Sequence, residues 1–335
     1  MTVTLADVAD ACNLSTSTVS RALSDPGKVN AATRSRIERV AREMGYVPNR
    51  VARSLVSGRT DTIGLVVPDI ANPFFPPVIK AVQARARDKG YSVLLADTDE
   101  HAADEIDRAR SLGKQADGLI LASPRTSLEG LHQFAGGGPV VFANREVPGA
   151  SSVVIDEAEG MAQAVEHLVG LGHRRICYLS GPRRSWSNKQ RHDAVVAASK
   201  EFGADLLELG PFEPQMQAGM RAADVLQSAG ATAAIAYDDL IALGVMARLS
   251  EQGMTVGREV SVIGIDDSPM SQTAYPMLTS IHVPGVELGT TAVDLLLAQI
   301  READGDEPAD GAAPGTALRL ETRLVIRGST GLPVG

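Results

Sequence analysis

The chain has 335 residues, with 32 Lys and Arg against 41 Asp and Glu, and a formal net charge of −9 at pH 7. Its 44% hydrophobic and 22% charged residues are typical of a soluble globular protein, and its length suits two or three domains. Because it has only two cysteines, a disulfide framework and a four-cysteine zinc site are excluded. No apolar stretch approaches a membrane span and the N-terminus is too polar for a signal peptide, so we expect a cytoplasmic protein.

The charge is unevenly distributed along the chain. Residues 1–60 contain nine basic and five acidic side chains, a balance of +4, so the remaining 275 residues carry −13. Such asymmetry indicates a basic module joined to an acidic body. The overall charge of −9 taken alone argues against nucleic acid as a partner, but the basic segment does not.

Three short helices are predicted in the basic segment. Apolar residues recur at i, i+3, i+4 and i+7 between Leu5 and Cys12, which is the spacing of one helix face. Ser15 is placed to cap a second helix, and Asn30 is placed to cap a third that ends at Gly45. Two short helices joined by a tight turn, with a third packed behind them, predict a helix-turn-helix domain.

The second helix is the candidate for reading DNA. Its exposed face carries small hydrogen-bonding side chains, which let a helix lie deep in the major groove. Arg21 has the geometry to bind a guanine edge through two hydrogen bonds, and Thr16 and Ser17 are expected to contact bases. Thr18 and Ser20 are expected to contact phosphates. The alternative is a small solvated helical bundle with Ser and Thr on its outer face.

Several motifs in a fixed order carry a resemblance to a known family. They are the DVA of the first helix, STSTVSRAL in the second, the GYVPN turn, ARSL, and IGLVVPDIANPFF. This order resembles the amino terminus of lactose-repressor-type (LacI/GalR) transcriptional regulators, and further likeness extends over essentially the whole chain. The expected DNA-contacting residues are Thr4, Leu5, Ser15, Thr16, Ser17, Thr18, Ser20, Arg21, Asn30, Asn49, Ala52, Arg53 and Leu55.

A hinge helix is predicted over residues 49–57, between Pro48 and Gly58. Nine residues are too few for a stable isolated helix, so this segment is expected to fold only when it pairs with a partner and with DNA. The resemblance implies that Leu55 enters the minor groove as an apolar wedge that kinks the duplex, with Ala52 and Arg53 beside it. The alternative is that Leu55 packs on the core.

The body alternates between strand and helix patterns, which predicts parallel sheets with helical crossovers. Strands are expected at 62–67, 91–96, 117–121, 139–143, 175–179, 232–236 and 260–265, and helices at 76–89, 157–171, 188–202, 214–229, 239–252 and 284–301. The fold class is α/β, with an all-α headpiece ahead of two doubly wound parallel sheets. By resemblance these sheets form a bilobed, periplasmic-binding-protein-like core.

The expected domains are a helix-turn-helix domain over 1–47, a hinge helix and linker over 48–60, and an effector-binding and dimerisation core over 61–335. Within the core, the N-lobe is expected at about 61–155 and 284–316. The C-lobe is expected at about 156–283 and 317–329.

Polar and aromatic side chains follow the predicted strands, where ligands bind in open α/β sheets. Carboxylates, amides and arginine suit a polyhydroxylated ligand, and aromatic rings stack on a sugar or base. The expected effector-binding residues are Phe74, Phe75, Asp97, Ser123, Asn144, Trp186, Arg191, Phe212, Tyr237, Asp238 and Asp266. Asp69 and Asp267 are expected to be structural turn residues, and Phe75 equally suits the lobe core.

Two departures from the family pattern leave the ligand open. Asp238-Asp239 stands where relatives often have Asn-Asp, and an ionised Asp accepts hydrogen bonds only, so it requires a donor or a positive charge on the ligand. The segment from Phe212 to Gly219 has unusual spacing, which leaves the role of Phe212 open.

The expected function is a sequence-specific DNA-binding transcriptional regulator that represses from a palindromic operator as a homodimer. A small polar effector, a sugar, sugar derivative or nucleoside, would control it from the cleft between the lobes. No cofactor, metal site or catalytic constellation is expected, and no leucine heptad follows the last predicted strand. The alternatives are a cytosolic sugar-binding module whose N-terminal segment contacts protein, and an α/β enzyme whose catalytic group the sequence does not show.

Overall fold

The computed structural model describes residues 3–24, 29–46, 58–305 and 315–334. The chain divides into two compact units, Met1–Thr60 and Asp61–Gly335. Four residues with expected DNA contacts, Asn49, Ala52, Arg53 and Leu55, lie outside the described residues.

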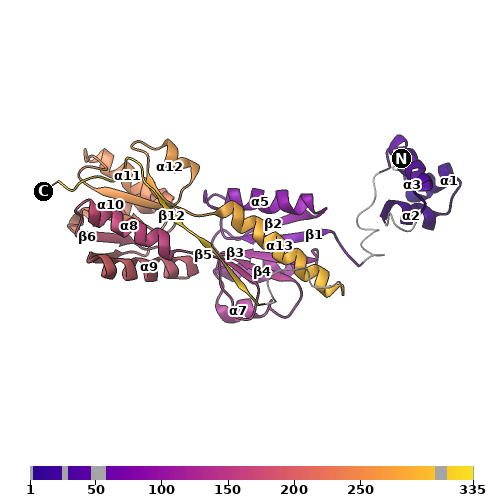
Figure 1. The fold of residues 1–335 in the computed structure, drawn as a ribbon, viewed down its shortest axis with the longest axis horizontal. Coiled ribbons are helices and arrows are strands. Elements are labelled where there is room, and N and C mark those ends of the chain that lie inside the picture. The colour runs from indigo at the N-terminus through magenta and orange to yellow at the C-terminus, as the bar shows by residue number, and fades with distance from the viewer. Residues whose placement is uncertain (1–2, 25–28, 47–57, 306–314, 335) are drawn as a thin grey trace. The chain divides into compact units, whose positions relative to one another are not determined.

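The first unit contains α1 (Leu5–Cys12), α2 (Thr16–Ser24) and α3 (Ala31–Glu43) (Figure 1). Two predicted caps are confirmed: Ser15 Oγ accepts a hydrogen bond from the backbone N–H of Thr18 at 3.2 Å, and Asn30 Oδ1 accepts one from Ala32 at 2.8 Å. A small apolar core joins the three helices through the buried side chains of Val8, Ala9, Cys12, Val19, Ala22, Ile37 and Ala41. These contacts give the helix-turn-helix arrangement that the sequence predicts.

The first lobe of the second unit is a six-stranded sheet in the order β11-β5-β4-β3-β1-β2, with every neighbouring pair parallel. Its strands are β1 (Thr62–Val67), β2 (Ser92–Asp97), β3 (Gly118–Ala122), β4 (Val140–Ala143), β5 (Ser152–Asp156) and β11 (Ala317–Glu321). Its helices are α5 (Phe75–Asp88), α6 (Ala102–Gly113), α7 (Leu128–His132) and α13 (Gly285–Ala303). Successive residues of β1 alternate between two cores, because Leu65 packs with α5 and α13 whereas Val66 packs with α6.

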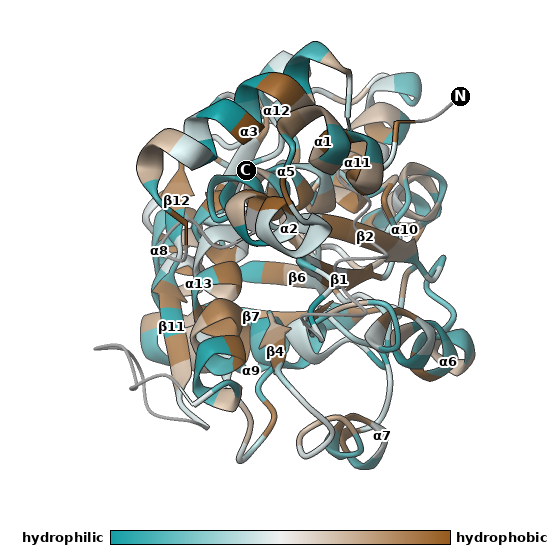
Figure 2. Ribbon diagram, turned by 90° about the vertical axis from the view of Figure 1, so that its right-hand side faces the viewer, coloured by the Kyte–Doolittle hydropathy of each residue, from teal (hydrophilic) through white to brown (hydrophobic). Residues whose placement is uncertain are grey.

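The second lobe is a six-stranded sheet in the order β12-β10-β9-β8-β6-β7, parallel except for the β10–β12 pair. Its strands are β6 (Arg175–Leu179), β7 (Asp205–Leu209), β8 (Ala233–Ala236), β9 (Ser261–Asp266), β10 (Thr279–His282) and β12 (Arg323–Val325). Its helices are α8 (Ala158–Gly170), α9 (Trp186–Phe202), α10 (Met216–Ser228), α11 (Asp239–Glu251) and α12 (Pro269–Thr273). Figure 2 shows hydrophobic residues along strands such as β1 and β2, and the central strands β1 and β3 are buried along most of their length, as expected for a sheet covered on both faces.

The chain crosses between the lobes three times, after β5, after β10 and after β11. Thr322 ties two of these crossovers together: its Oγ1 donates to the carbonyl oxygen of Asp156 at 2.9 Å and accepts from the N–H of Gly160 at 3.2 Å. A Cβ on Gly160 would collide with Thr322 and with Ile281, which precedes the remaining crossover. The three crossovers are therefore closely packed.

One part of the expected lobe division is wrong. The sequence pattern predicts that 317–329 belongs to the second lobe, but β11 pairs in parallel with β5 in the first sheet, with Ala317 opposite Ser152. The chain therefore completes the first sheet before it crosses at Thr322 to β12. Five strands, β5, β7, β10, β11 and β12, lie outside the expected strand ranges.

Helices α10 and α11 approach each other at a pair of glycines. A Cβ on Gly244 would collide with the backbone carbonyl of Met216, and a Cβ on Gly219 would collide with that of Ile241. Because both obstacles are backbone atoms, a larger residue cannot be accommodated by moving a side chain.

We predict that Gly244→Ala lowers the free energy of unfolding by about 2 kcal/mol or more, because it overpacks the α10–α11 contact. Gly170→Ala is the matched control: this helical glycine has open space where a Cβ would stand, so we expect a gain of about 0.4–1 kcal/mol. Urea unfolding followed by circular dichroism measures both. Equal stability of the two variants would contradict the assigned close approach.

Candidate functional site

A polar cavity lies between the two lobes, where the strands of both sheets end. It is lined by Asn72, Phe74, Phe75, Ser123, Arg125, Asn144, Ser187, Arg191, Tyr237, Asp238 and Asp266. The free space at its centre is about 20 Å³, room for about one water molecule. The surrounding side chains offer many hydrogen-bonding groups to a small polar ligand.

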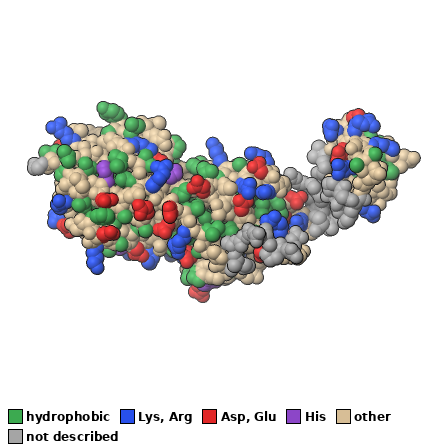
Figure 3. Space-filling view, in the orientation of Figure 1, with side chains coloured by type: hydrophobic (Ala, Val, Ile, Leu, Met, Phe, Trp, Pro, Cys, Tyr) green, Lys and Arg blue, Asp and Glu red, His purple; other side chains and the backbone are tan. Residues whose placement is uncertain are grey.

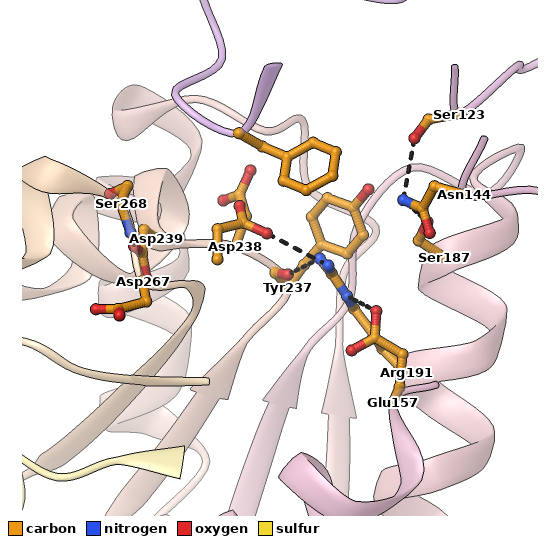
Figure 4. Close-up of polar contacts among 12 residues, drawn as sticks. Ser123, Asn144, Glu157, Ser187, Arg191, Tyr237, Asp238, Asp239, Asp267 and Ser268 are labelled. Atoms are coloured by element: carbon orange, nitrogen blue, oxygen red, sulfur yellow. Dashed lines mark hydrogen bonds and ion pairs between the residues drawn. The ribbon is translucent and has the colours of Figure 1, made fainter. Parts of the chain in front are cut away.

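Two turns aim first-lobe side chains into this cavity. Ser123 follows β3 with φ 46° and Asn144 follows β4 with φ 54°, a left-handed conformation that Asn tolerates better than most residues. The Asn144 amide nitrogen donates to Ser123 Oγ at 3.0 Å and, across the cleft, to Ser187 Oγ at 3.0 Å (Figure 4). Its Oδ1 is buried without a partner, so it is free to accept a hydrogen bond.

Arg191 on α9 is the central charged group of the second lobe. Its Nε donates to Glu157 Oε1 at 2.8 Å, its Nη1 to the carbonyl oxygen of Tyr237 at 2.6 Å, and its Nη2 to Asp266 Oδ1 at 3.4 Å (Figure 4). The guanidinium carbon lies 4.9 Å from the centre of the Tyr237 ring, a cation–π contact. Burial alone would lower the pKa of Arg191, but the carboxylates of Glu157 and Asp266 outweigh it and the pKa is raised.

Asp238 is the N-cap of α11 and also faces the cavity. Its Oδ1 accepts from the N–H of Ile241 at 2.9 Å, and its Oδ2 accepts from the amide of Asn72 in the other lobe at 3.3 Å. Burial raises the pKa of Asp238 to about 6. Burial also raises the pKa of Asp266 well above its ordinary value, against the opposing effect of Arg191.

The neighbouring Asp239 has a different, structural position. Its Oδ2 accepts from the N–H of Ser268 at 2.7 Å and its Oδ1 accepts from the hydroxyl of Ser280 at 2.7 Å, so it holds the turn after β9. It does not line the cavity. Burial raises the pKa of Asp239 to about 7.

A second arginine and two aromatic residues complete the first-lobe wall. Arg125 follows β3 and binds Glu100 through two hydrogen bonds of 2.6 and 2.7 Å, while its Nη1 donates to the carbonyl oxygen of Ser123. Phe74 and Phe75 pack edge to face with ring centres 5.0 Å apart. The wall thus combines a paired charge with an aromatic surface.

In the first unit, α2 presents the residues expected to read DNA. Thr16, Ser17 and Arg21 are exposed, whereas Thr18 and Ser20 are half-buried. Lys and Arg side chains predominate over acidic ones on the face of this unit seen in Figure 3. A short, basic, hydroxyl-rich helix on a small rigid bundle has the build of a major-groove reader.

Three other expected DNA contacts, Thr4, Ser15 and Asn30, are helix N-caps. The carboxylate of Asp7 accepts from the N–H of Thr4 at 2.7 Å, while Thr4 Oγ1 accepts from the N–H of Asp7 at 3.3 Å. Leu5 is half-buried and packs against the core of the bundle. The caps place helix N-termini, which favour anions, beside these side chains.

Comparisons with known proteins agree with both units. A model of bacterial regulatory proteins of the lacI family matches residues 4–49, and a periplasmic binding protein-like domain matches residues 165–330. The HTH-type transcriptional repressor CytR of Escherichia coli K12 is 34% identical over 338 residues, which cover 98% of this chain and 96% of the relative. The chain belongs to the lacI family.

Two solved structures extend the likeness to three dimensions. The lac repressor dimer bound to operator and the anti-inducer ONPF matches with a TM-score of 0.87 and 28% identity, covering 99% of this chain and 100% of that one. The CelR–cellobiose complex matches with a TM-score of 0.70 and 30% identity, covering 98% and 99%. This lacI-family chain is a DNA-binding transcriptional regulator, and the expected family, fold class and function are confirmed.

Eight of the eleven expected effector residues line the cavity: Phe74, Phe75, Ser123, Asn144, Arg191, Tyr237, Asp238 and Asp266. Asp97, Trp186 and Phe212 do not. The Asp97 carboxylate instead accepts from the backbone N–H of Asp99 in its own loop and from that of Ile70 in the loop after β1, and Phe212 packs against the second-lobe core. Asp267, expected to be structural, pairs with Arg327 and His282.

Three lining residues, Asn72, Arg125 and Ser187, are absent from the expected set. Asn72 and Arg125 both follow strands, which is the signal that identified the others. Ser187 adjoins Trp186 in the first turn of α9, which begins two residues before the predicted helix over 188–202, and Ser187 rather than Trp186 faces the cavity. In the described part of the chain, no cluster of His, Cys, Asp and Glu suits a metal ion, and no helix is both long and apolar enough to cross a membrane.

We predict a pH-dependent cost of Asp239 to stability. Its folded pKa of about 7 lies above the ordinary value, so its contribution to stability is fully present at low pH and is lost as the pH rises through about 7. The thermal stability of the wild type minus that of Asp239→Asn should therefore fall between pH 5 and pH 8. Asp224→Asn is the control, because the Arg248 hydrogen bond lowers the pKa of the exposed Asp224 and the corresponding difference should stay flat. A flat difference for Asp239→Asn contradicts the prediction.

Proposed function

We propose that the protein is a cytoplasmic repressor whose paired headpieces bind a palindromic operator and whose effector occupies the cavity between its lobes. The observation that carries the proposal is the combination in one chain of a helix-turn-helix unit and a two-lobed core with polar side chains at its strand ends. We keep 1–47 as the DNA-binding domain, 48–60 as the hinge and 61–335 as the core, with the first lobe extended to residue 321.

The proposed DNA contacts divide by position on the headpiece. Thr16, Ser17 and Arg21 on α2 would meet base edges, while Thr18 and Ser20 would meet phosphates. The capping residues Thr4, Ser15 and Asn30, together with Leu5, would position the three-helix unit on the sugar-phosphate backbone of the DNA. The roles of Asn49, Ala52, Arg53 and Leu55 in a groove-inserting hinge helix stay predictions, since these residues lie outside the described range.

The ion pair of Arg191 and Glu157 supports a route by which the effector controls the lobes. Glu157 lies in the crossover after β5, and Arg191 lies in the cavity wall. A ligand that moves Arg191 or Asp266 therefore acts directly on the connection between the lobes. The strength of this control equals the difference in effector affinity between the two lobe arrangements.

The related proteins support the effector class. CelR is described in complex with cellobiose, and another solved lacI-family regulator, from Enterococcus faecium, contains ribose. A cavity with paired carboxylates, amides and three aromatic rings is compatible with such polyhydroxylated compounds.

We predict that Arg21→Ala lowers specific operator binding by about 1–3 kcal/mol, because a bidentate guanine contact is lost, and changes nonspecific binding much less. Arg39→Ala is the matched control, since Arg39 on α3 is exposed and pairs with Glu43 on its own helix. Fluorescence anisotropy on operator and scrambled duplexes measures both, after footprinting on the chain's own promoter region identifies the site. A footprint without two-fold symmetry would contradict the repressor assignment. The absence of any footprint at low salt would favour the alternative of a sugar-binding module.

A palindromic operator requires a homodimer, and a homodimer requires an apolar contact surface on each copy. Strand β2 is an edge strand on which Leu94 and Leu95 are 39% and 41% exposed, and the second lobe exposes Tyr275 and Met277 around α12. We propose that these apolar side chains pack against a second copy, because an exposed hydrophobic edge is otherwise prone to aggregation.

We predict that Leu94→Asp weakens the dimer at least tenfold by placing a charge in the apolar contact. Val225→Asp is the control, because Val225 on α10 is similarly exposed, at 46%, but lies outside the proposed surface. Sedimentation velocity over a concentration series gives both dissociation constants. Dimers of equal strength would exclude β2 from the interface.

A further inference from the structure

Both guanidinium groups that line the cavity are already neutralised. Arg191 is paired with Glu157 at 2.8 Å and with Asp266 at 3.4 Å. Arg125 is paired with Glu100, which it grips with two nitrogen atoms. Neither arginine therefore offers an uncompensated positive charge to a ligand.

Two hydrogen-bond acceptors in the lining remain open to a ligand, beside the hydroxyl groups of Ser123 and Ser187, which accept from Asn144 and keep their own hydrogens to donate. Asp238 lines the cavity with a carboxylate that accepts only from the Ile241 N–H and from the Asn72 amide, the latter at a long 3.3 Å. Asn144 Oδ1 is buried in the same lining with no partner. Figure 4 shows Asp238 and Asn144 on opposite sides of Tyr237 and Arg191. A ligand placed between them meets acceptors on both sides.

A neighbouring cavity of about 170 Å³ also lacks an unpaired cation in its lining. It shares Phe74 and Asp266 with the first cavity and adds the carboxylates of Asp267 and Glu287. Its one imidazole, His282, is hydrogen-bonded to Asp267 at 3.1 Å. A ligand that extends from the first cavity into this one would again meet carboxylates.

We propose that the effector carries no anionic group and presents hydroxyl or amine hydrogens to Asp238 and Asn144. On this proposal a free sugar, amino sugar or nucleoside binds, whereas the matching phosphate or acid does not. A buried anion needs a cation to balance its charge, whereas in this lining each arginine is already paired with a carboxylate and Asp238 adds a further negative charge. The half-buried Arg145, which follows Asn144, does not line either cavity. The inference rests on the proposed function, because it takes this cavity as the effector site.

The test uses the full-length protein and matched neutral and anionic compounds. Thermal shift and calorimetry compare each neutral or amine-bearing compound with its anionic counterpart. The pairs are ribose with ribose 5-phosphate, and adenosine with its monophosphate. Glucose and glucosamine are compared with glucose 6-phosphate and gluconate, and cellobiose is tested as a further neutral compound. The expected result is that at least one neutral or amine-bearing compound binds and that its anionic counterpart binds at least tenfold more weakly. The proposal is overturned if an anion binds within tenfold of its neutral counterpart or more tightly, or if no neutral or amine-bearing compound stabilises the protein at 10 mM.

Asp238→Asn tests the assigned residue, because it removes the charge at almost constant size. For the compound that binds the wild type, we expect affinity to fall at least tenfold and the preference over its anionic counterpart to shrink. Asp239→Asn is the matched control one residue along, since Asp239 lines neither cavity and its carboxylate accepts from the Ser268 N–H and the Ser280 hydroxyl. The preference of this variant for the neutral compound should equal that of the wild type. An unchanged preference in Asp238→Asn excludes this role for Asp238.

Operator binding by the ligand-free wild type separates failure of this inference from failure of the proposed function. If the protein binds operator but prefers anions, this inference fails and the repressor function stands. If it binds no operator, the proposed function fails whatever the ligand series shows. Should Asp238→Asn not fold, the wild-type series alone decides the charge of the effector.

Discussion

The buried ion pair between Arg191 and Glu157 is the interaction on which the rest of the core depends. It joins a residue of the cavity wall to a residue of an interlobe crossover, and both side chains are almost fully buried. A buried charge is tolerated only when it is paired and hydrogen-bonded, which explains why the guanidinium also reaches Asp266 and the carbonyl of Tyr237. The lobes, the ligand site and the crossover thus share one electrostatic network.

This network constrains what the cavity is able to bind. Since Arg125 is paired with Glu100 and Arg191 with Glu157 and Asp266, their charges are already balanced, and the Asp238 carboxylate faces the cavity with hydrogen bonds from Asn72 and Ile241. Asn72 and Ser187 already connect the lobes through hydrogen bonds to Asp238 and Asn144. An effector that replaces these contacts by its own hydrogen bonds changes the lobe arrangement without breaking the ion pair.

Much of the architecture could be predicted from residue patterns. Strands β1 and β6 lie where the alternation of β-branched runs and helices placed them, and the caps at Ser15 and Asn30 follow from side-chain chemistry. The strands that the sequence pattern did not predict have weak local signals. In β10, Thr279 and Ser280 are polar yet buried, because the turn at Asp239 and the C-terminal segment supply their partners. The placement of β11 depends on pairing with β5, far away in sequence, so no local pattern contains it.

The residues of the candidate site likewise divide into those that a local sequence pattern identifies and those that depend on the three-dimensional fold. Residues at strand ends were found because parallel strands end at a common edge, as with Asn144 and Asp238. Trp186 and Ser187 are adjacent in sequence, and only the orientation of α9 determines which of them faces the cavity. Asp97 also ends a strand, but β2 is at the outer edge of its sheet, away from the cavity. Strand order, which the sequence does not display, thus separates ligand positions from loop positions.

The packing of the crossovers around Gly160 has a mechanical consequence. Thr322 joins one connection to another through two hydrogen bonds, and the absence of a side chain at residue 160 lets the third connection lie against them. A side chain added at residue 160 would therefore press on all three connections at once, although the residue lies in neither cavity.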